Sequence, residues 1–293
     1  MYSAVAANKR NTVIIMAVFI GVAGAIGWAV AAMMGNTALT PWILAGIVIY
    51  AFVQYFLASK LAVAATGAVE IQKRDNPRLW RIVENLAITD GLPMPKVYVI
   101  DDPAPNAFAT GRGPKNAIVC ATTGIMEIMD NRELTAVMAH EMGHVKNYDI
   151  RVSMIAFGLA SAIGLISDMA LHAMWFGGGD SDNRDVPVQF YIFGVVLVVL
   201  APVAAALIQM AISRQREYLA DATGALTTRD PEALASALEK LQQYGQPMQR
   251  QSTSTAHLFF NNPLKPGMLA NLFSTHPPLE DRIARLRDNA GKF

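Results

Sequence analysis

The sequence predicts a mainly α-helical integral membrane protein, with four transmembrane helices and an α+β part outside the bilayer that contains a small β-sheet. The chain of 293 residues is 53% hydrophobic and only 16% charged, whereas soluble domains carry about 25% charged residues. Its apolar residues also gather in four long runs. The segments between and after these runs have mixed polarity, with short strand and turn patterns.

The first two apolar runs predict an N-terminal transmembrane hairpin over residues 1–59. Residues 12–34 contain no charged side chain and follow Lys9 and Arg10, and residues 41–59 form the second run. The first run is long enough to cross about 30 Å of hydrocarbon as a helix. A cleaved signal peptide is the alternative, but the apolar core of such a peptide usually has only about 7 to 15 residues.

The third and fourth apolar runs predict a second hairpin over residues 152–212, with spans at about 152–175 and 188–212. Asp168 and His172 lie four residues apart in the third run and could suggest a second metal or proton site. They fall near the far end of that span, where polar groups can reach water. We therefore interpret them as interfacial residues.

The distribution of positive charge predicts the orientation of these helices. Lys and Arg are concentrated at the N-terminus, in residues 60–151 and in residues 213–293, while the loops on the other side hold only Arg184. The positive-inside rule then places both termini and both of these segments in the cytoplasm. The single cysteine, Cys120, cannot form an internal disulfide, which fits a reducing compartment, and its apolar surroundings predict a buried position.

Three short strands and a helix are expected in residues 60–151. Asn76 followed by proline predicts the start of a helix. Residues 96–100, 106–110 and 116–120 have the pattern of short strands. An exposed strand beside a catalytic helix would let a peptide pair with its edge.

The motif HEMGH, residues His140 to His144, carries the chemistry. Residues four apart share one face of a helix, so the two histidines can bind one metal ion, and Glu141 stands beside it. Glu141 could take a proton from an attacking water and pass it to a leaving amine. Chance predicts roughly 0.003 copies of this pattern at this composition. Asp130 and Glu133 predict a capping box at the start of the helix.

A catalytic zinc ion needs a third protein ligand and an open position. Glu217 is the best candidate, because it lies in SRQREYLAD, where the helix of the fourth run would continue into the cytoplasm. Asp221, one helical turn later on the same face, could accept the second ring N–H of a histidine ligand. The alternative is that Glu217 is a solvated carboxylate that pairs with Arg214 or Arg216.

Four segments, HEMGH, EYLAD, NAFATG and THPPLEDRI, together with the four apolar runs, resemble the HtpX family of membrane zinc peptidases, which are relatives of the CaaX prenyl protease. The resemblance covers essentially the whole chain. It implies a zincin-like (gluzincin) catalytic domain that holds one zinc ion on His140, His144 and Glu217. It also implies Glu141 as the general base.

The resemblance further implies residues that contact the substrate. Asn106, with Ala107 and Phe108 of the same segment, is expected to contact the substrate backbone. His276 and Arg282 are expected to lie near the oxyanion that develops during hydrolysis. The alternatives are that His276 caps or packs against the following helix and that Arg282 forms a surface salt bridge.

These features predict a zinc-dependent endopeptidase of the bacterial inner (cell) membrane. The family resemblance connects it with quality control of misfolded or damaged membrane proteins and with the stress response. Its partners would be protein substrates and the lipid bilayer. The net charge of +1 gives no reason to propose nucleic acid. The sequence predicts no oligomeric state.

A non-catalytic zinc scaffold or a metal transporter is the alternative function. A transporter would need ionisable groups within its spans, and the first, second and fourth runs have none. A structural zinc site would favour four protein ligands without a general base beside them. Arg132 and Lys146, which flank HEMGH, also argue against a motif buried in lipid.

Overall fold

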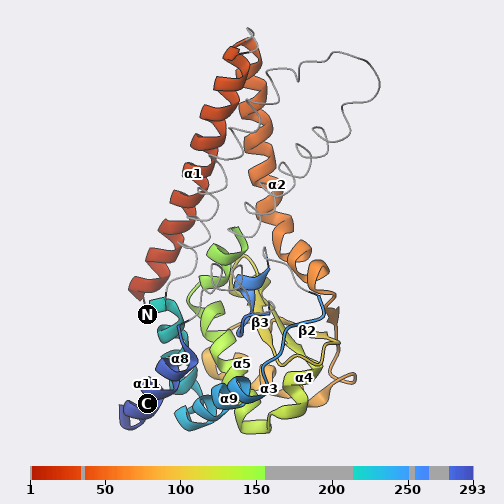
Figure 1. Cartoon of the computed structure of the whole chain (residues 1–293), viewed down its shortest axis with the longest axis vertical. Coiled ribbons are helices and arrows are strands. Elements are labelled where there is room, and N and C mark those ends of the chain that lie inside the picture. Colours follow the sequence, from red (N-terminus) through yellow and green to blue (C-terminus); the bar gives the residue numbers. More distant parts are fainter. Residues whose placement is uncertain (1, 34–36, 156–213, 251–254, 264–276, 293) are drawn as a thin grey trace, which may run out of the picture.

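A long helical pair projects from a compact body (Figure 1). The computed structural model describes residues 2–33, 37–155, 214–250, 255–263 and 277–292. Helices α1 (Tyr2–Met33) and α2 (Thr40–Thr66) lie side by side and are joined near the 3-10 turn η1 (Thr37–Leu39). Within the described part of the chain, α2 is the helix that is long and apolar enough to cross a membrane. Beyond residue 155, the predicted second hairpin lies outside the described residues.

The small predicted sheet is present and has four strands in the order β1-β2-β4-β3. Its strands are β1 (Val69–Glu70), β2 (Lys96–Ile100), β3 (Ala107–Thr110) and β4 (Ile118–Thr122). β2 and β4 pair in parallel, and the two outer strands pair antiparallel to their neighbours. β4 begins later than predicted because the 3-10 turn η2 (Pro114–Asn116) includes the first residue of the expected strand and Ala117 follows as its C-cap.

Both faces of the sheet are covered, which explains why β4 is apolar throughout. Val119 and Ala121 point into the core on one face, while Ile118 and Cys120 point to the other. That second face packs against the part of α1 and α2 nearest the sheet, which we call the foot of the helical pair. Ile15 of α1 is fully buried there. The burial predicted for Cys120 is confirmed, and burial raises the pKa of its thiol well above the usual value.

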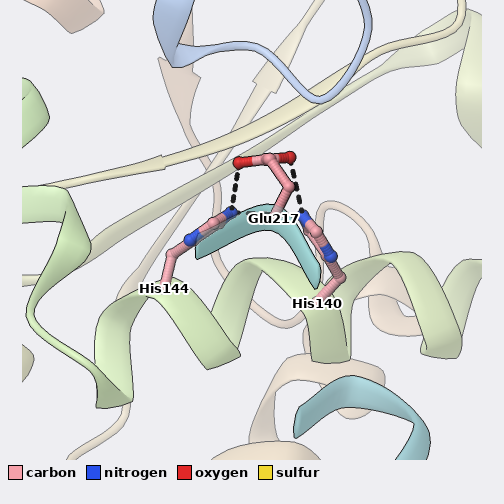
Figure 2. Close-up of side chains that lie close together, drawn as sticks. All are labelled: His140, His144 and Glu217. Carbon is pink, nitrogen blue, oxygen red and sulfur yellow. Dashed lines mark hydrogen bonds and ion pairs between the residues drawn. The ribbon is translucent and has the colours of Figure 1, made fainter. Parts of the chain in front are cut away.

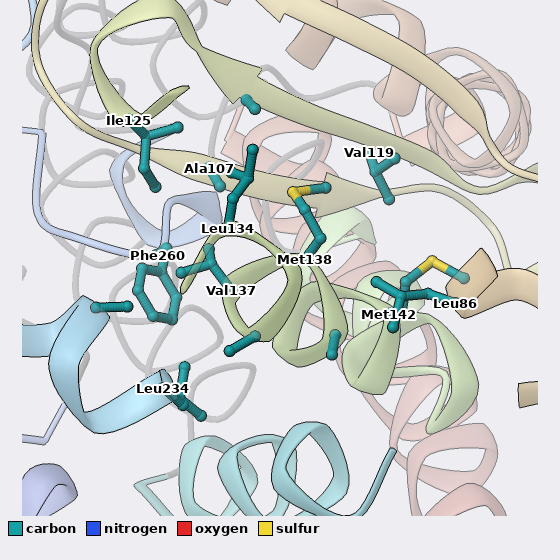
Figure 3. Close-up of a cluster of buried hydrophobic side chains, with 14 of the residues drawn as sticks. Leu86, Ala107, Val119, Ile125, Leu134, Val137, Met138, Met142, Leu234 and Phe260 are labelled. Atoms are coloured by element: carbon teal, nitrogen blue, oxygen red, sulfur yellow. The ribbon is translucent and has the colours of Figure 1, made fainter. Parts of the chain in front are cut away.

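Helices surround the other face of the sheet. They are α3 (Pro77–Asp90), α4 (Thr123–Ile128), α5 (Asn131–Lys146), α8 (Arg214–Thr228), α9 (Pro231–Tyr244) and α11 (Leu279–Asp288), with 3-10 turns η3 (Ala256–Leu258) and η4 (Ala290–Lys292). Both predicted helix starts are confirmed: Asn76 caps α3, and Asp130 with Glu133 forms a capping box at α5. α5 lies at the centre, and its apolar side chains form the core with the sheet, as Figure 3 shows for Leu134 and Met138.

Helix α8 packs closely on α5, and small residues allow this approach. A Cβ atom on Gly224 of α8 would lie 3.0 Å from the backbone nitrogen of His140, and one on Gly143 would lie 3.3 Å from Cβ of Thr223. Any larger side chain at Gly224 would push the two helices apart. The glycines therefore bring the backbone of α8 against the HEMGH helix.

The HEMGH helix does not run straight on from the motif. α5 ends at Lys146, and Tyr148 adopts a φ of 62°, a left-handed conformation that bulky residues rarely adopt. A new helical segment starts at residue 149. The HEMGH helix and the helical segment that starts at residue 149 are therefore separate. The chain turns between the two.

Candidate metal centre

Three predicted ligands, two from α5 and one from α8, meet at one point (Figure 2). Nε2 of His140 lies 3.1 Å from Nε2 of His144. The carboxylate of Glu217 bridges them, with one oxygen 3.8 Å from His140 Nε2 and the other 3.5 Å from His144 Nε2. His140 and Glu217 are buried, and His144 is partly exposed.

These separations fit a zinc ion. Nitrogen and oxygen ligands about 2.0 to 2.2 Å from a tetrahedral zinc lie roughly 3.3 to 3.6 Å from one another. The three measured distances, 3.1, 3.5 and 3.8 Å, scatter around that value. Two ring nitrogens and a carboxylate pointed at each other would repel unless a cation or a proton lay between them. The donor set therefore matches a metal site with an open fourth position.

The ring of His140 is fixed by a carboxylate on α8. Its Nδ1 lies 2.9 Å from Oδ1 of Asp221, which was predicted for this role. Arg282 of α11 holds the same carboxylate with two hydrogen bonds, from Nε at 2.9 Å and from Nη2 at 2.7 Å. An N–H on Nδ1 that donates to Asp221 leaves Nε2 free to bind metal.

The ring of His144 is fixed by a residue that the sequence did not single out. Its Nδ1 lies 3.1 Å from Oδ2 of Asp149, which is buried just after the left-handed turn at Tyr148. The signal in the sequence was weak, because a helix that continued without a break would carry Asp149 away from His144. Only the turn brings the carboxylate back to the ring.

The two histidines have opposite pKa shifts. Burial lowers the pKa of His140 to about 4, although Asp221 opposes this change. Burial also acts to lower the pKa of His144, but the surrounding carboxylates outweigh it and raise the pKa to about 9. These carboxylates are Asp149, Glu217 and Glu141. Their combined charge favours a cation at this point, whether a proton or a metal ion.

Two further groups complete the surroundings of His140. Glu141, the predicted general base, is buried beside the ligands, and its charge acts on both His144 and Arg282. The ring of Phe260, which the sequence did not point to, packs edge-on against His140 with centroids 4.8 Å apart. The guanidinium of Arg282 lies 4.8 Å over the same phenyl ring. Arg282 is fully buried, so the surface salt bridge considered as its alternative is wrong.

The predicted substrate-contact segment has partners within the chain. The side chain of Asn106 donates to the carbonyl of Asn261 at 2.8 Å and accepts from its backbone N–H at 3.0 Å. The N–H of Phe260 donates to the carbonyl of Ala107, and Phe108 is fully buried. Part of the edge of this strand is therefore paired with a later segment of the chain itself. The contact of Asn106, Ala107 and Phe108 with substrate stays a prediction, and His276 lies outside the described residues.

The comparisons with known proteins identify the family of this chain. Residues 73–290 match the model of peptidase family M48. The chain belongs to this family. It is 57% identical over 295 residues to "Protease HtpX homolog" of Tropheryma whipplei (strain TW08/27), with 100% of both chains covered. It is 44% identical over 292 residues to the protein of the same name from Ligilactobacillus salivarius (strain UCC118), with 98% of this chain and 99% of the relative covered.

A solved structure is similar to this M48 chain in fold. The crystal structure of S. mikatae Ste24p superposes with a TM-score of 0.50 at 17% sequence identity, covering 98% of this chain and 67% of that chain. The predicted resemblance to the HtpX family is confirmed, and the fold is similar to that of Ste24p. The chain is a metalloendopeptidase of the HtpX type, mainly helical with a small sheet.

Proposed function

We propose that this chain is a zinc-dependent endopeptidase of the bacterial inner (cell) membrane that cleaves misfolded or damaged membrane proteins from the cytoplasmic side. The observation that carries the proposal is the convergence of His140, His144 and Glu217 on one point, with Glu141 on the same helix. Zinc bound there would polarise the scissile carbonyl and lower the pKa of a water molecule.

The chain's own residues would supply the proton transfer and the positioning. Glu141 would accept the proton of the attacking water and deliver it to the leaving amine. Asp221 and Asp149 would keep the two imidazoles in the tautomer that binds metal. Nη1 of Arg282 is buried, has no hydrogen bond partner among the described residues and lies 3.9 Å from Glu217. It could donate to the negative charge that develops on the substrate carbonyl, together with His276.

The proposed topology has four spans, with hairpins in residues 1–59 and 152–212 and two cytosolic catalytic parts in residues 60–151 and 213–293. The foot of α1 and α2 packs directly on the catalytic sheet, which supports a site close to the membrane surface (Figure 1). Lys9 and Arg10 at this foot are exposed, as expected for a cytoplasmic boundary. Membrane proteins, or segments released from the bilayer, would then reach the site without crossing a large distance.

The test is Glu141→Gln, which keeps the shape of the side chain and removes its basicity. The protein would be purified in detergent with a chelator present and then loaded with zinc. We expect one zinc ion per chain, as in the parent, and no cleavage of an unfolded protein substrate or of the enzyme itself. Unchanged cleavage by this variant would contradict the proposed mechanism.

Glu217→Ala tests the third ligand. We expect its zinc content to fall well below one ion per chain, because only two protein ligands remain. Glu239→Ala is the matched control, since Glu239 is a partly exposed glutamate of α9 that pairs with Arg287. Equal zinc content in both variants would show that Glu217 is not a ligand.

A further inference from the structure

The N-terminal helix reaches the metal centre through one buried side chain. Asn8 of α1 is only 5% exposed, and its side-chain amide donates to Oδ1 of Asp149 at 2.6 Å and to the carbonyl of Asn147 at 2.8 Å. The other oxygen of Asp149 lies 3.1 Å from Nδ1 of His144. A continuous path of polar contacts therefore leads from α1 to a metal ligand.

Asn8 is the principal support of the Asp149 carboxylate outside the HEMGH helix. Within the part of the chain that the structure describes, the other ion-pair partner of Oδ1 of Asp149 is the more distant Nε of Arg216, at 3.9 Å. A buried carboxylate that loses its donor is costly and tends to shift toward another donor or toward water. Such a shift would rotate the ring of His144 that the same carboxylate holds.

The turn that carries Asp149 also depends on α1. Tyr148 has the left-handed φ of 62°, which costs free energy for a side chain of this size and persists only where its surroundings hold it. Asn8 holds the residue before Tyr148 and the residue after it, and the ammonium group of Lys9 lies 4.8 Å over the Tyr148 ring. Consecutive residues of α1 thus clamp this turn from outside.

We propose that Asn8 is a positioning residue of the metal centre and that α1 is a working part of the catalytic site as well as a membrane helix. By fixing Asp149, Asn8 keeps Nε2 of His144 directed at the metal. A displacement of α1 relative to the catalytic body would release this ligand. The proposal rests on the zinc site proposed above.

Zinc affinity, measured by competition with a chelator, tests this role in the Glu141→Gln background, where self-cleavage cannot interfere. We expect Asn8→Ala to weaken zinc binding about tenfold, in line with the loss of an outer partner of a metal ligand. The visible absorption of the cobalt-substituted protein should change as well, because it reports the geometry of the ligands. Asn11→Ala is the matched control, since Asn11 is the other asparagine of α1 and has no hydrogen bond partner within the described residues.

A charge swap keeps the test valid even if single variants fold poorly. Asn8→Asp places two carboxylates together and should weaken zinc binding about 100-fold. Adding Asp149→Asn restores one donor and one acceptor, so the double variant should bind zinc at least about tenfold more tightly than Asn8→Asp alone. A double variant no better than Asn8→Asp would overturn the proposal, as would Asn8→Ala with parental affinity and an unchanged cobalt spectrum. If the Glu141→Gln parent itself binds no zinc, the proposed zinc site fails instead.

Discussion

The two histidine ligands are held by the same kind of contact but by different parts of the molecule. Nδ1 of His140 contacts the carboxylate of Asp221 on α8, and Arg282 of α11 donates two hydrogen bonds to that carboxylate. Nδ1 of His144 contacts the carboxylate of Asp149, and the neutral side-chain amide of Asn8 on α1 donates a hydrogen bond to that carboxylate. One side is built entirely within the catalytic body, whereas the other depends on the N-terminal helix.

The two sides also differ in charge. Burial lowers the pKa of His140 to about 4, and the positive charge of Arg282, which pairs with Asp221, adds to this effect. Among the described residues, the nearest cation to Asp149 is Arg216, at 3.9 Å, and the carboxylates around His144 raise its pKa to about 9. The Asp221 charge beside His140 is therefore balanced by Arg282, whereas the His144 side carries an excess of negative charge that favours a metal ion.

The largest expected effect is a difference in folding stability between variants of the two carboxylates that hold His140 and His144. Asp221→Ala leaves the buried guanidinium of Arg282 without its hydrogen-bonded carboxylate and with only the more distant Glu217 at 3.9 Å, which should cost about 3 to 5 kcal/mol of folding free energy. Asp149→Ala removes a partner of two groups, the Asn8 amide, which keeps the carbonyl of Asn147, and Nδ1 of His144, and this should cost about 1 to 3 kcal/mol. The thermal unfolding midpoints of both zinc-free variants in detergent would measure this difference.

Equal midpoints for these two variants would contradict the comparison. Asp221→Ala combined with Arg282→Met provides the control, because it removes the stranded charge together with its partner. That double variant should be more stable than Asp221→Ala alone.

A smaller effect is expected when the charge of Arg282 is kept and its shape is changed. Lysine cannot reproduce the two-point contact with Asp221, so Arg282→Lys should let His140 move and weaken zinc binding about tenfold. Arg285→Lys is the matched control, because Arg285 lies on the same helix but is exposed and packs over Tyr218. Chelator competition would measure both variants, and equal affinities would show that charge alone is sufficient at Arg282.

The sequence predicted the local features of this site well and the features that depend on tertiary contacts poorly. HEMGH, the capping box at Asp130 and the carboxylate pair of Glu217 and Asp221 follow from helical spacing, and the structure has these residues together. Asp149 and Asn8 could not be found in this way. Their contact depends on a left-handed turn at Tyr148. It also joins two residues that lie 141 positions apart in the sequence.

The strand predicted at residues 106–110 shows the same limit of sequence reasoning. The pattern of these residues correctly indicated a short extended segment, which is β3 at the edge of the sheet. It could not indicate that Phe259 and Phe260, much later in the chain, would lie along that edge. Strand patterns report which face of a strand is apolar, but not which distant segment pairs with its edge.

The smallest expected effect tests whether Glu133, at the start of α5, stabilises the fold independently of the contacts that hold His140 and His144. Burial acts to raise the pKa of Glu133, but bonds from Lys240 at 2.6 Å, Ser236 at 2.7 Å and the Asp130 amide at 2.8 Å lower it below 4.5 overall. A lowered carboxyl pKa contributes stability above pH 4.5, and this contribution is lost as the pH falls through the folded-state value.

Glu133→Gln should therefore lower the stability of the zinc-free protein by roughly 1 to 2 kcal/mol at pH 7 and make little difference in acid. Glu127→Gln, an exposed change on α4, should have no effect at either pH. Glu133 lies about 10 Å along the helix from His140, so its loss should add to that of Asp149→Ala without coupling. A non-additive double variant would mean that the two ends of α5 are one cooperative unit, and that α1 stabilises the whole helix rather than the His144 side alone.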